Sequence, residues 1–319
     1  MTTSFFLWPE VHIPQGLASA YRLIPVNRIE EKLCNMFPGG YPVLCTSGRA
    51  ALYMALDASG ISRRDSVGIF PYASHCVLDA VSRVGTPLTG PTSIVADFRV
   101  VYHQWGYVQE KNLPANAIED CVDTLCIPGT ALFPGGGAFE IWSLPKILGT
   151  TSGGVLWCRD EETANRIRIK RNKKGGGAFQ WITRLFGYRN PGIYDYWQGA
   201  ESRYRKVSSL QTGEIWNAIQ QWDTIVSDRL QKLELVWPYA VDWLQKPVNR
   251  LPTVVPLLPQ LTEIVIKELG LSAGYRMIEK INADNTRELV KTIPLPVYKQ
   301  VPKDWLEKIA QTIGKENDQ

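Results

Sequence analysis

Apolar positions in the first two thirds of the chain alternate between two spacings. Short apolar runs, typical of buried strands, occur at 43–45, 66–72 and 153–158. Each run precedes a segment with helical spacing, and these segments begin at Ser47, Ser74 and Asp160. Serine and aspartate favour helix N-caps because their side chains accept backbone hydrogen bonds. Strands that alternate with helices predict an α/β fold with a mostly parallel sheet.

The pattern changes after Ser208. The remaining strands expected before that point lie at 93–98, 100–105 and 117–120, with an additional helix at 28–37. After it, residues 210–245 form a long amphipathic helical stretch, and 303–313 predict a final helix. We therefore divide the chain into a large α/β domain at 1–207 and a smaller C-terminal domain at 208–319, entered by a long helix.

Composition narrows the function classes. The 319 residues are 45% apolar and 21% charged, which is typical of a soluble globular protein. The net charge of +4 is too small and scattered to indicate nucleic-acid binding, and the basic run 166–174 is typical of a solvated helix end. No stretch reaches the roughly twenty apolar residues that a membrane span needs, so we expect a cytoplasmic protein.

Cysteine and histidine spacing gives no sign of a metal site. The six cysteines form no CxxC pair, and His12, His75 and His103 are far apart in the sequence. We therefore expect reduced cysteines and no metal.

Two short segments place polar groups at helix starts. In "CTSGRAAL" a strand turns into a helix at Ser47 and Gly48, where exposed N–H groups and the helix dipole favour an anion. An ordinary N-cap is the alternative for Ser47. In "IFPYASHCV", His75 follows a strand that ends at Pro71, so its ring is expected at the carboxyl edge of the sheet, where ligands of open α/β folds bind. A histidine satisfied by its neighbours is the alternative.

Two other segments carry opposite charges. "AIEDCVD" puts Glu119 and Asp120 at the end of a strand, and a buried aspartate needs a cationic partner or hydrogen bonds. A protonated ring nitrogen would supply one. In "FEIWSLPKILGTTSGG", Lys146 lies within an apolar run. Desolvation disfavours an ammonium ion, so an amine in a dry pocket becomes a nucleophile toward aldehydes. The alternative is a lysine that extends from an apolar surface into water.

The order of these segments resembles the DegT/DnrJ/EryC1/StrS family of sugar aminotransferases, which depend on pyridoxal 5′-phosphate (PLP) and have the aspartate aminotransferase fold type I. Similar segments run from Arg28 to the end of the chain; they lie at 28–52, 70–88, 100–106, 117–125, 139–172, 204–215 and 292–313. The resemblance implies a mostly parallel central sheet flanked by helices, a smaller C-terminal α+β domain, PLP as cofactor, and a homodimer with the active site between subunits.

Site residues follow from the same resemblance. Lys146 would hold PLP as a Schiff base and later shuttle a proton, while Asp120 would pair with the pyridinium nitrogen. His75 would stack on the ring. The phosphate would be held by Ser47 and by the backbone at Gly48 and Arg49, with Ser143 as a substitute for a family serine.

Several positions depart from the family pattern. Arg49 and Ile141 stand where the family usually has hydroxyl residues, and Tyr204 stands where the neighbouring subunit usually supplies an asparagine. Asp123 replaces a glutamine or histidine, and an extra carboxylate near the cofactor hydroxyl is unfavourable unless it is protonated or turned away. Only about thirty residues separate "GTPL" from "IEDC", where the family normally has another strand–helix unit.

The resemblance implies an aminotransferase that moves an amino group, from a donor such as glutamate, onto a keto sugar. That sugar would be linked to a nucleotide and used in polysaccharide or secondary-metabolite biosynthesis. Two alternatives stay open because of the departures. One is a PLP enzyme of another reaction type, such as a dehydratase or an enzyme of small amino acid chemistry. The other is a catalytically inactive binding or partner protein.

Overall fold

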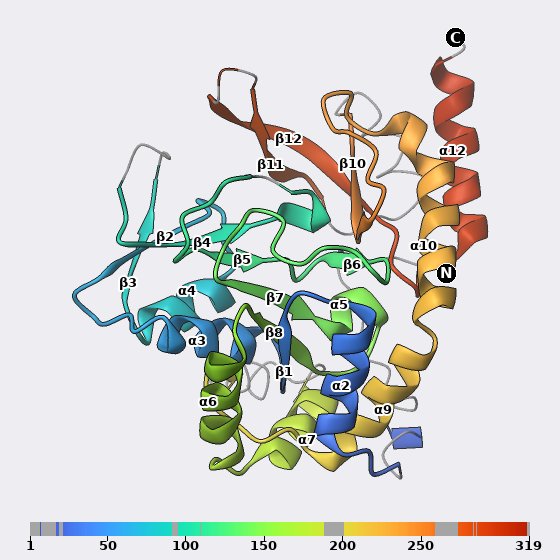
Figure 1. Ribbon diagram of the computed structural model, residues 1–319. Helices are drawn as coiled ribbons and strands as arrows, with labels where there is room; N and C mark the ends of the chain where they lie inside the picture. Colours follow the sequence, from blue (N-terminus) through green and yellow to red (C-terminus); the bar gives the residue numbers. More distant parts are fainter. Residues whose placement is uncertain are drawn as a thin grey trace.

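A central sheet with helices packed against it forms the body of the molecule in the computed structural model (Figure 1). The structure describes residues 7, 17–18, 22–90, 95–108, 110–187, 201–258, 274–282, 284 and 286–317. His12 and residues 93–94, both part of the sequence-based expectations, lie outside these ranges.

The central sheet has the strand order β1-β8-β7-β5-β4-β2-β3 among the described residues. Its strands are β1 (Tyr41–Cys45), β2 (Ser66–Ile69), β3 (Thr86–Thr89), β4 (Phe98–Tyr102), β5 (Ile118–Asp120), β7 (Phe139–Ser143) and β8 (Gly154–Cys158). Only β8 runs antiparallel to its neighbours, β1 and β7. The other pairings, β2 with β3 and β4, β4 with β5, and β5 with β7, are parallel. This arrangement confirms the predicted α/β class with a mostly parallel sheet.

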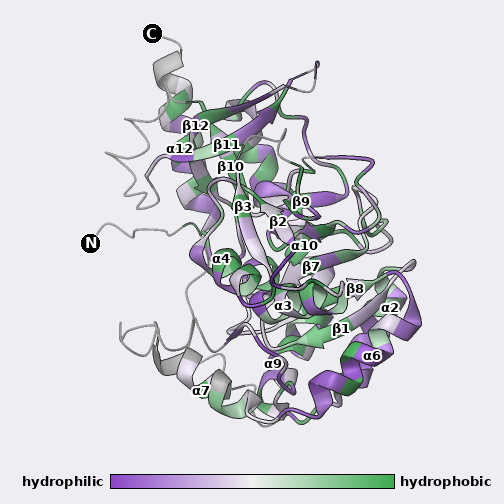
Figure 2. Ribbon diagram, turned by 90° about the vertical axis from the view of Figure 1, so that its left-hand side faces the viewer, coloured by the Kyte–Doolittle hydropathy of each residue, from purple (hydrophilic) through white to green (hydrophobic). Residues whose placement is uncertain are grey.

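Helices pack against the sheet, namely α2 (Val26–Met36), α3 (Gly48–Ala58), α4 (His75–Ser82) and α6 (Glu161–Asn172), while α7 (Gly177–Gly187) contacts α9. The buried side of α3, including Met54 and Leu56, packs in one core with Val67 of β2 and Ile118 of β5. By contrast, α6 is predominantly hydrophilic (Figure 2). Its first turn is capped by Asp160, which accepts a hydrogen bond from Thr163 N–H as the sequence predicted.

An aromatic cluster anchors the strand that precedes Lys146. Trp142 on β7 contacts Phe37 edge-on at a centroid distance of 5.0 Å and Trp157 on β8 at 5.1 Å. Its indole N–H donates to the buried Glu140 at 2.6 Å. Packed aromatic rings at these distances and angles add to the stability gained from burial alone. The end of β7 is therefore held rigidly.

The C-terminal part contains two long helices side by side, α10 (Trp222–Val236) and α12 (Lys303–Asn317) (Figure 1). Its antiparallel sheet has the order β10-β12-β11. The other elements of this part are α9 (Ser209–Gln220), β9 (Arg250–Pro252), β10 (Val254–Leu257), β11 (Arg276–Ile281), β12 (Arg287–Pro296) and the short helix η2 (Trp237–Tyr239). A second short helix, η1 (Gln104–Gly106), lies between β4 and β5. Because β9 pairs with β6 (Thr124–Cys126), the C-terminal part is tied to the segment after β5. The domain boundary at 207/208 stays a prediction.

Two expected elements differ in the structure. The helical stretch 210–245 is broken at Gln221, which ends α9 and starts α10, and the helix stops at Val236 before the Trp237–Pro238 pair. Proline cannot donate the backbone hydrogen bond that would continue the helix. The strand expected at 93–98 is also wrong in extent, because residues 95–97 are not strand and β4 begins at Phe98.

The connection from β3 to β4 is short for parallel strands. β3 ends at Thr89 and β4 begins at Phe98, whereas such crossovers usually need a dozen or more residues and a helix. The shortening expected from the sequence is thus located here. The C-terminal strands reach this part of the sheet, since Arg287 of β12 forms an ion pair with Glu110, which also binds Arg99 of β4. None of the described helices is long and apolar enough to cross a membrane.

Candidate active site

Asp120 ends β5 and is buried, with 5% of its surface exposed. It lies in register with Ile141 of the neighbouring β7. Val122 N–H donates to its Oδ1 at 3.3 Å, the one hydrogen bond to this carboxylate within the described part of the chain. Burial raises the pKa of Asp120 to about 6; Lys146 lowers this pKa and the neighbouring Asp123 raises it. Asp120 is thus a buried carboxylate that a nearby cation would stabilise.

Lys146 lies in α5 (Leu144–Leu148), a short helix that begins directly after β7. Its Nζ is 2.9 Å from Oδ1 of Asp123, and the two side chains are 26% and 0% exposed. The sequence suggested an amine in a dry pocket. In the structure the lysine is half-buried and ion-paired. Asp123, the residue that departs from the family pattern, faces the amine.

Tyr102, at the end of β4, is the second partner of Asp123. Its hydroxyl donates to Oδ2, the carboxylate oxygen that does not face Lys146. Burial and the charge of Asp123 hold the pKa of Tyr102 well above its ordinary value, so the phenol stays protonated and acts as the donor. Sequence reasoning missed Tyr102, because its contact with Asp123 depends on β4 and β5 being neighbours.

A strained turn holds this pair in place. Trp105 has a left-handed backbone with φ of 58°, and its N–H donates to the Tyr102 hydroxyl at 3.4 Å. Gly106 follows with φ of 111°, and a Cβ added there would lie 2.9 Å from the carbonyl oxygen of Asp123. Only glycine fits both this conformation and this close approach. The backbone of Asp123 is therefore packed against the turn.

The start of α3 lies beside the end of β7. Ser47 is the N-cap and accepts a hydrogen bond from Ala50 N–H at 3.1 Å, so the capping interpretation of this serine is confirmed. A Cβ added to Gly48 would lie 3.2 Å from Cβ of Ser143, and one added to Gly154 would lie 2.5 Å from the carbonyl of Ser47. The helix start, Ser143 and the loop after Lys146 thus meet at one place, with the first N–H groups of α3 available to an anion.

The other sequence candidates are placed as follows. His75 is the first residue of α4 and is exposed, and none of the described contacts joins it to Asp120 or Lys146. The Arg49 guanidinium lies 3.8 Å from the buried Glu201, so its backbone rather than its side chain is left for an anion. Ile141 is fully buried in the core. Tyr204 donates to Asp57 of α3 at 2.7 Å.

Three of the six basic side chains of the run 166–174 form ion pairs with other helices. Arg168 and Arg171 bind the two oxygens of the buried Glu30 at 3.0 and 2.6 Å, and Lys170 binds Asp57 at 2.9 Å. These contacts connect α6 to α2 and α3. They favour a structural role for the run over a binding patch.

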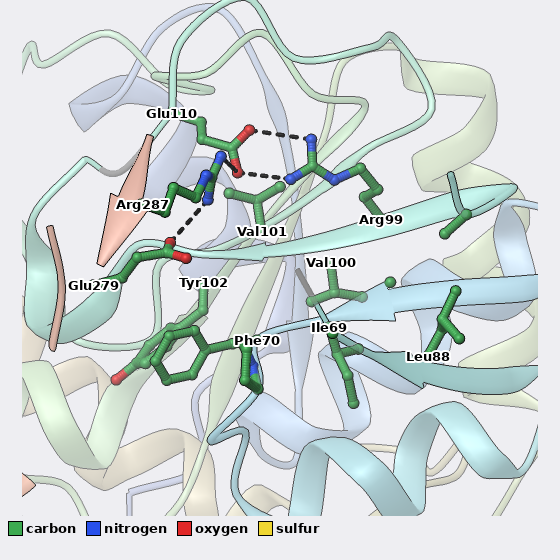
Figure 3. A pocket seen from close by; sticks show the side chains of 14 residues that line it. Ile69, Phe70, Leu88, Arg99, Val100, Val101, Tyr102, Glu110, Glu279 and Arg287 are labelled. Atoms are coloured by element: carbon green, nitrogen blue, oxygen red, sulfur yellow. Dashed lines mark hydrogen bonds and ion pairs between the residues drawn. The ribbon is translucent and has the colours of Figure 1, made fainter. Parts of the chain in front are cut away.

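A pocket borders the site at the ends of β2 and β4 (Figure 3). Phe70 and Tyr102 form part of its wall, with ring centroids 5.9 Å apart. On another side, Arg287 links Glu110 and Glu279 through two ion pairs of 2.8 Å (Figure 3). Burial opposes ionisation of Glu110, but Arg287 and Arg99 outweigh it and hold the pKa of Glu110 below its ordinary value. The pocket and the lysine site share Tyr102.

These residues fit PLP. The Lys146 amine and the buried Asp120 carboxylate, whose pKa is raised, lie at or just after the ends of adjacent strands. PLP carries an aldehyde that suits the amine and a ring nitrogen that suits the carboxylate. The start of α3, with Ser143 beside it, is suited to a phosphate. Because positions 49 and 141 carry no hydroxyl, the contacts to a phosphate would come from the backbone and from the nearby serines.

Comparisons with known proteins agree with this geometry. Residues 29–266 match the model of a family described as "Putative PLP-dependent aminotransferase". A search of curated proteins gave no match. Solved structures share the fold over nearly the whole chain. The sugar aminotransferase CalS13 from Micromonospora echinospora is 15% identical, with a TM-score of 0.64 and coverage of 99% of this chain and 100% of that one.

Two further structures give similar values. DesV from S. venezuelae is 14% identical, with a TM-score of 0.60 and coverage of 96% and 93%. DesI, solved in the presence of its TDP-sugar product, is 13% identical, with a TM-score of 0.60 and coverage of 100% and 95%. At these identities the likeness establishes the fold. Because the family model spans most of the sequence, the chain belongs to the PLP-dependent aminotransferases, with the fold of the DegT/DnrJ/EryC1/StrS sugar aminotransferases.

Proposed function

We propose that this aminotransferase moves an amino group from a donor such as glutamate onto a keto sugar, with PLP bound at Lys146. One observation carries the proposal. The Lys146 amine lies 2.9 Å from Asp123, three residues after the buried Asp120 that ends β5, at the carboxyl edge of a parallel sheet. Ligands of open α/β sheets bind at that edge.

The chain's own groups have distinct tasks in this proposal. Bound PLP supplies an aldehyde and a conjugated ring that accepts electrons. Lys146 binds the aldehyde carbon and later carries a proton on Nζ. Asp120 keeps the ring nitrogen protonated. The N–H groups of Gly48 and Arg49, with Ser47 and Ser143, bind the phosphate, and His75 stacks on the ring.

The acceptor is proposed from the structural neighbours. CalS13 is a sugar aminotransferase, and DesI was solved with a TDP-sugar product. These likenesses support a keto sugar linked to a nucleotide, in polysaccharide or secondary-metabolite biosynthesis. A homodimer with a shared active site is a further prediction from the family resemblance, and a cytoplasmic location is one from the sequence.

A second candidate is another PLP reaction, such as dehydration. Asp123 favours it, because a charged carboxylate at the amine is a departure from the glutamine or histidine of the sugar aminotransferases. The two candidates differ in their response to amino donors. Transamination requires glutamate to convert bound PLP into its amine form, with loss of the visible absorption band.

The test uses purified protein incubated with PLP. A lysine adduct should give a yellow protein that bleaches on borohydride reduction, and Lys146→Ala should lose the colour. Lys170→Ala removes a surface lysine paired with Asp57 and should keep it. Colourless wild-type protein in excess PLP would refute the proposal. A yellow protein that responds to no amino donor would favour the second candidate.

A further inference from the structure

Asp123 has two partners on its two oxygens. Lys146 Nζ lies 2.9 Å from Oδ1, and the Tyr102 hydroxyl donates to Oδ2. Its side chain is fully buried, and a buried carboxylate is stable only when a cation or several donors compensate it. In this arrangement the lysine contributes the positive charge and the tyrosine one neutral donor. The lysine and the tyrosine together therefore compensate the buried carboxylate of Asp123.

Two carboxylates act on Lys146, and the charged groups on the neighbouring elements are engaged with other partners. Asp120 and Asp123 both act on it from the segment that ends β5. His103, the next residue after Tyr102, is engaged by the buried Glu119 at 2.8 Å. From α9, Glu214 accepts two hydrogen bonds from Thr151. From α3, Arg49 is directed toward Glu201, so the cationic contribution there is the helix N-terminus.

We propose that Asp123 is a catalytic residue that holds a positive charge on the Lys146 nitrogen, and that Tyr102 is a positioning residue that limits this effect. The inference rests on the proposed function, since it concerns PLP bound at Lys146. With PLP bound, Lys146 would hold the aldehyde carbon through Nζ, and Asp123, 2.9 Å away, would stabilise a positive charge on that nitrogen.

Two opposite effects follow from one substitution. In Asp123→Asn, the pH midpoint at which the visible spectrum of the PLP-bound protein changes should fall by about 1–3 units. This is the shift typical of removing an opposite charge at this distance. Cofactor-free Asp123→Asn should also capture PLP about tenfold faster at neutral pH, because the amine is released from the carboxylate that faces it at 2.9 Å. Stopped-flow absorbance measures the capture, and a pH titration of the visible spectrum measures the shift.

Further variants separate this inference from the proposed function. Asp123→Glu should restore a titration midpoint near the wild-type value. Tyr102→Phe removes the donor to Oδ2, so the midpoint should rise, by about one unit or less. Asp304→Asn, the same chemical change at an exposed position of α12, should change neither quantity.

Each outcome has one meaning. If wild-type protein and PLP give no colour, the proposed function fails. If wild type and the variants are coloured but Asp123→Asn and Tyr102→Phe titrate like wild type, the proposed function stands and this inference is wrong. If Asp123→Asn does not fold, the Tyr102→Phe titration alone decides: a rise supports the inference, while no change or a fall refutes it.

Discussion

Glu119 and Asp120 are consecutive residues of β5 and both are buried, yet they differ in the number of hydrogen-bond partners that their carboxylates have. Glu119 accepts hydrogen bonds from Gly135 and Gly137 N–H at 2.6 and 2.7 Å and binds His103 at 2.8 Å. Asp120 accepts one, from Val122 N–H, within the described residues, and its pKa is raised to about 6. Successive side chains of a strand point to opposite faces, so one dipeptide serves both sides of the sheet.

The difference between these two carboxylates indicates their tasks. A buried carboxylate whose oxygens are all occupied stabilises the chain around it, here the glycine loop at 135–137. One that is left short of donors is costly to the fold and is retained where a ligand supplies the missing cation. Matched substitutions of the two residues test this interpretation, because each exchanges a carboxylate for an amide of the same shape.

The largest effect is expected from Glu119→Gln. The amide offers one acceptor oxygen and turns a donor toward groups that are themselves donors, so at least one backbone N–H at 135–137 loses its partner. We expect a loss of about 3–4 kcal/mol in the free energy of unfolding, from two interactions of 1–3 kcal/mol each. Urea denaturation measures it. An unchanged midpoint would mean that Glu119 is not the anchor of this loop.

Asp120→Asn should have the opposite sign in cofactor-free protein. The folded-state pKa of about 6 lies above the ordinary value of 3.8, so the ionised carboxylate destabilises the fold above pH 6 by up to about 3 kcal/mol. That cost disappears as the pH falls from 6 to 4, because the folded protein takes up the proton. The variant should therefore be more stable than wild type at pH 8 and equal to it below pH 4.

The same variant should lose activity. Without the carboxylate, the ring nitrogen of bound PLP loses its charged partner, and we expect a fall in the rate of transamination of about 100-fold or more. The combination of higher stability and lower activity is specific to a group held for a ligand. If Asp120→Asn were destabilising at pH 8, the assignment of Asp120 as an uncompensated carboxylate would be wrong.

The smallest effect is expected at the pocket, where the charges compensate one another. Arg287→Met removes the partner of Glu110 and Glu279 and should cost about 1 kcal/mol at pH 7, since the side chains of these ion pairs are partly exposed. The pKa of Glu110 is lowered by its arginines, so this stabilisation is lost as the pH falls below 4.5. Thermal unfolding of the variant and wild type should show a larger difference at pH 7 than at pH 3.

Local signals in the sequence predicted much of the fold. The strands at 43–45 and 153–158 and the cap at Asp160 depend on neighbouring residues alone, and the structure has them. The break at Gln221 was not predictable, because apolar positions continue at helical spacing through it. The run at 139–148 contains a strand followed by a one-turn helix, and periodicity cannot divide so short and mostly apolar a segment.

The site was predictable to a different degree. Asp120 and Lys146 were found because their residue types are unusual where they stand. The ion pair between Asp123 and Lys146, and the donor from Tyr102, depend on which strands are neighbours in the sheet. Strand order is a property of the whole fold, so no single stretch of sequence carries it.

Gly154 shows how the parts of the site keep their spacing. A methyl group at this position would overlap the carbonyl of Ser47 at 2.5 Å, so the strand after the lysine loop and the first turn of α3 touch backbone to backbone. No side chain stands between them to change its rotamer. The separation between the anion-binding end of the helix and the strand after the lysine loop is thus set by main-chain contact.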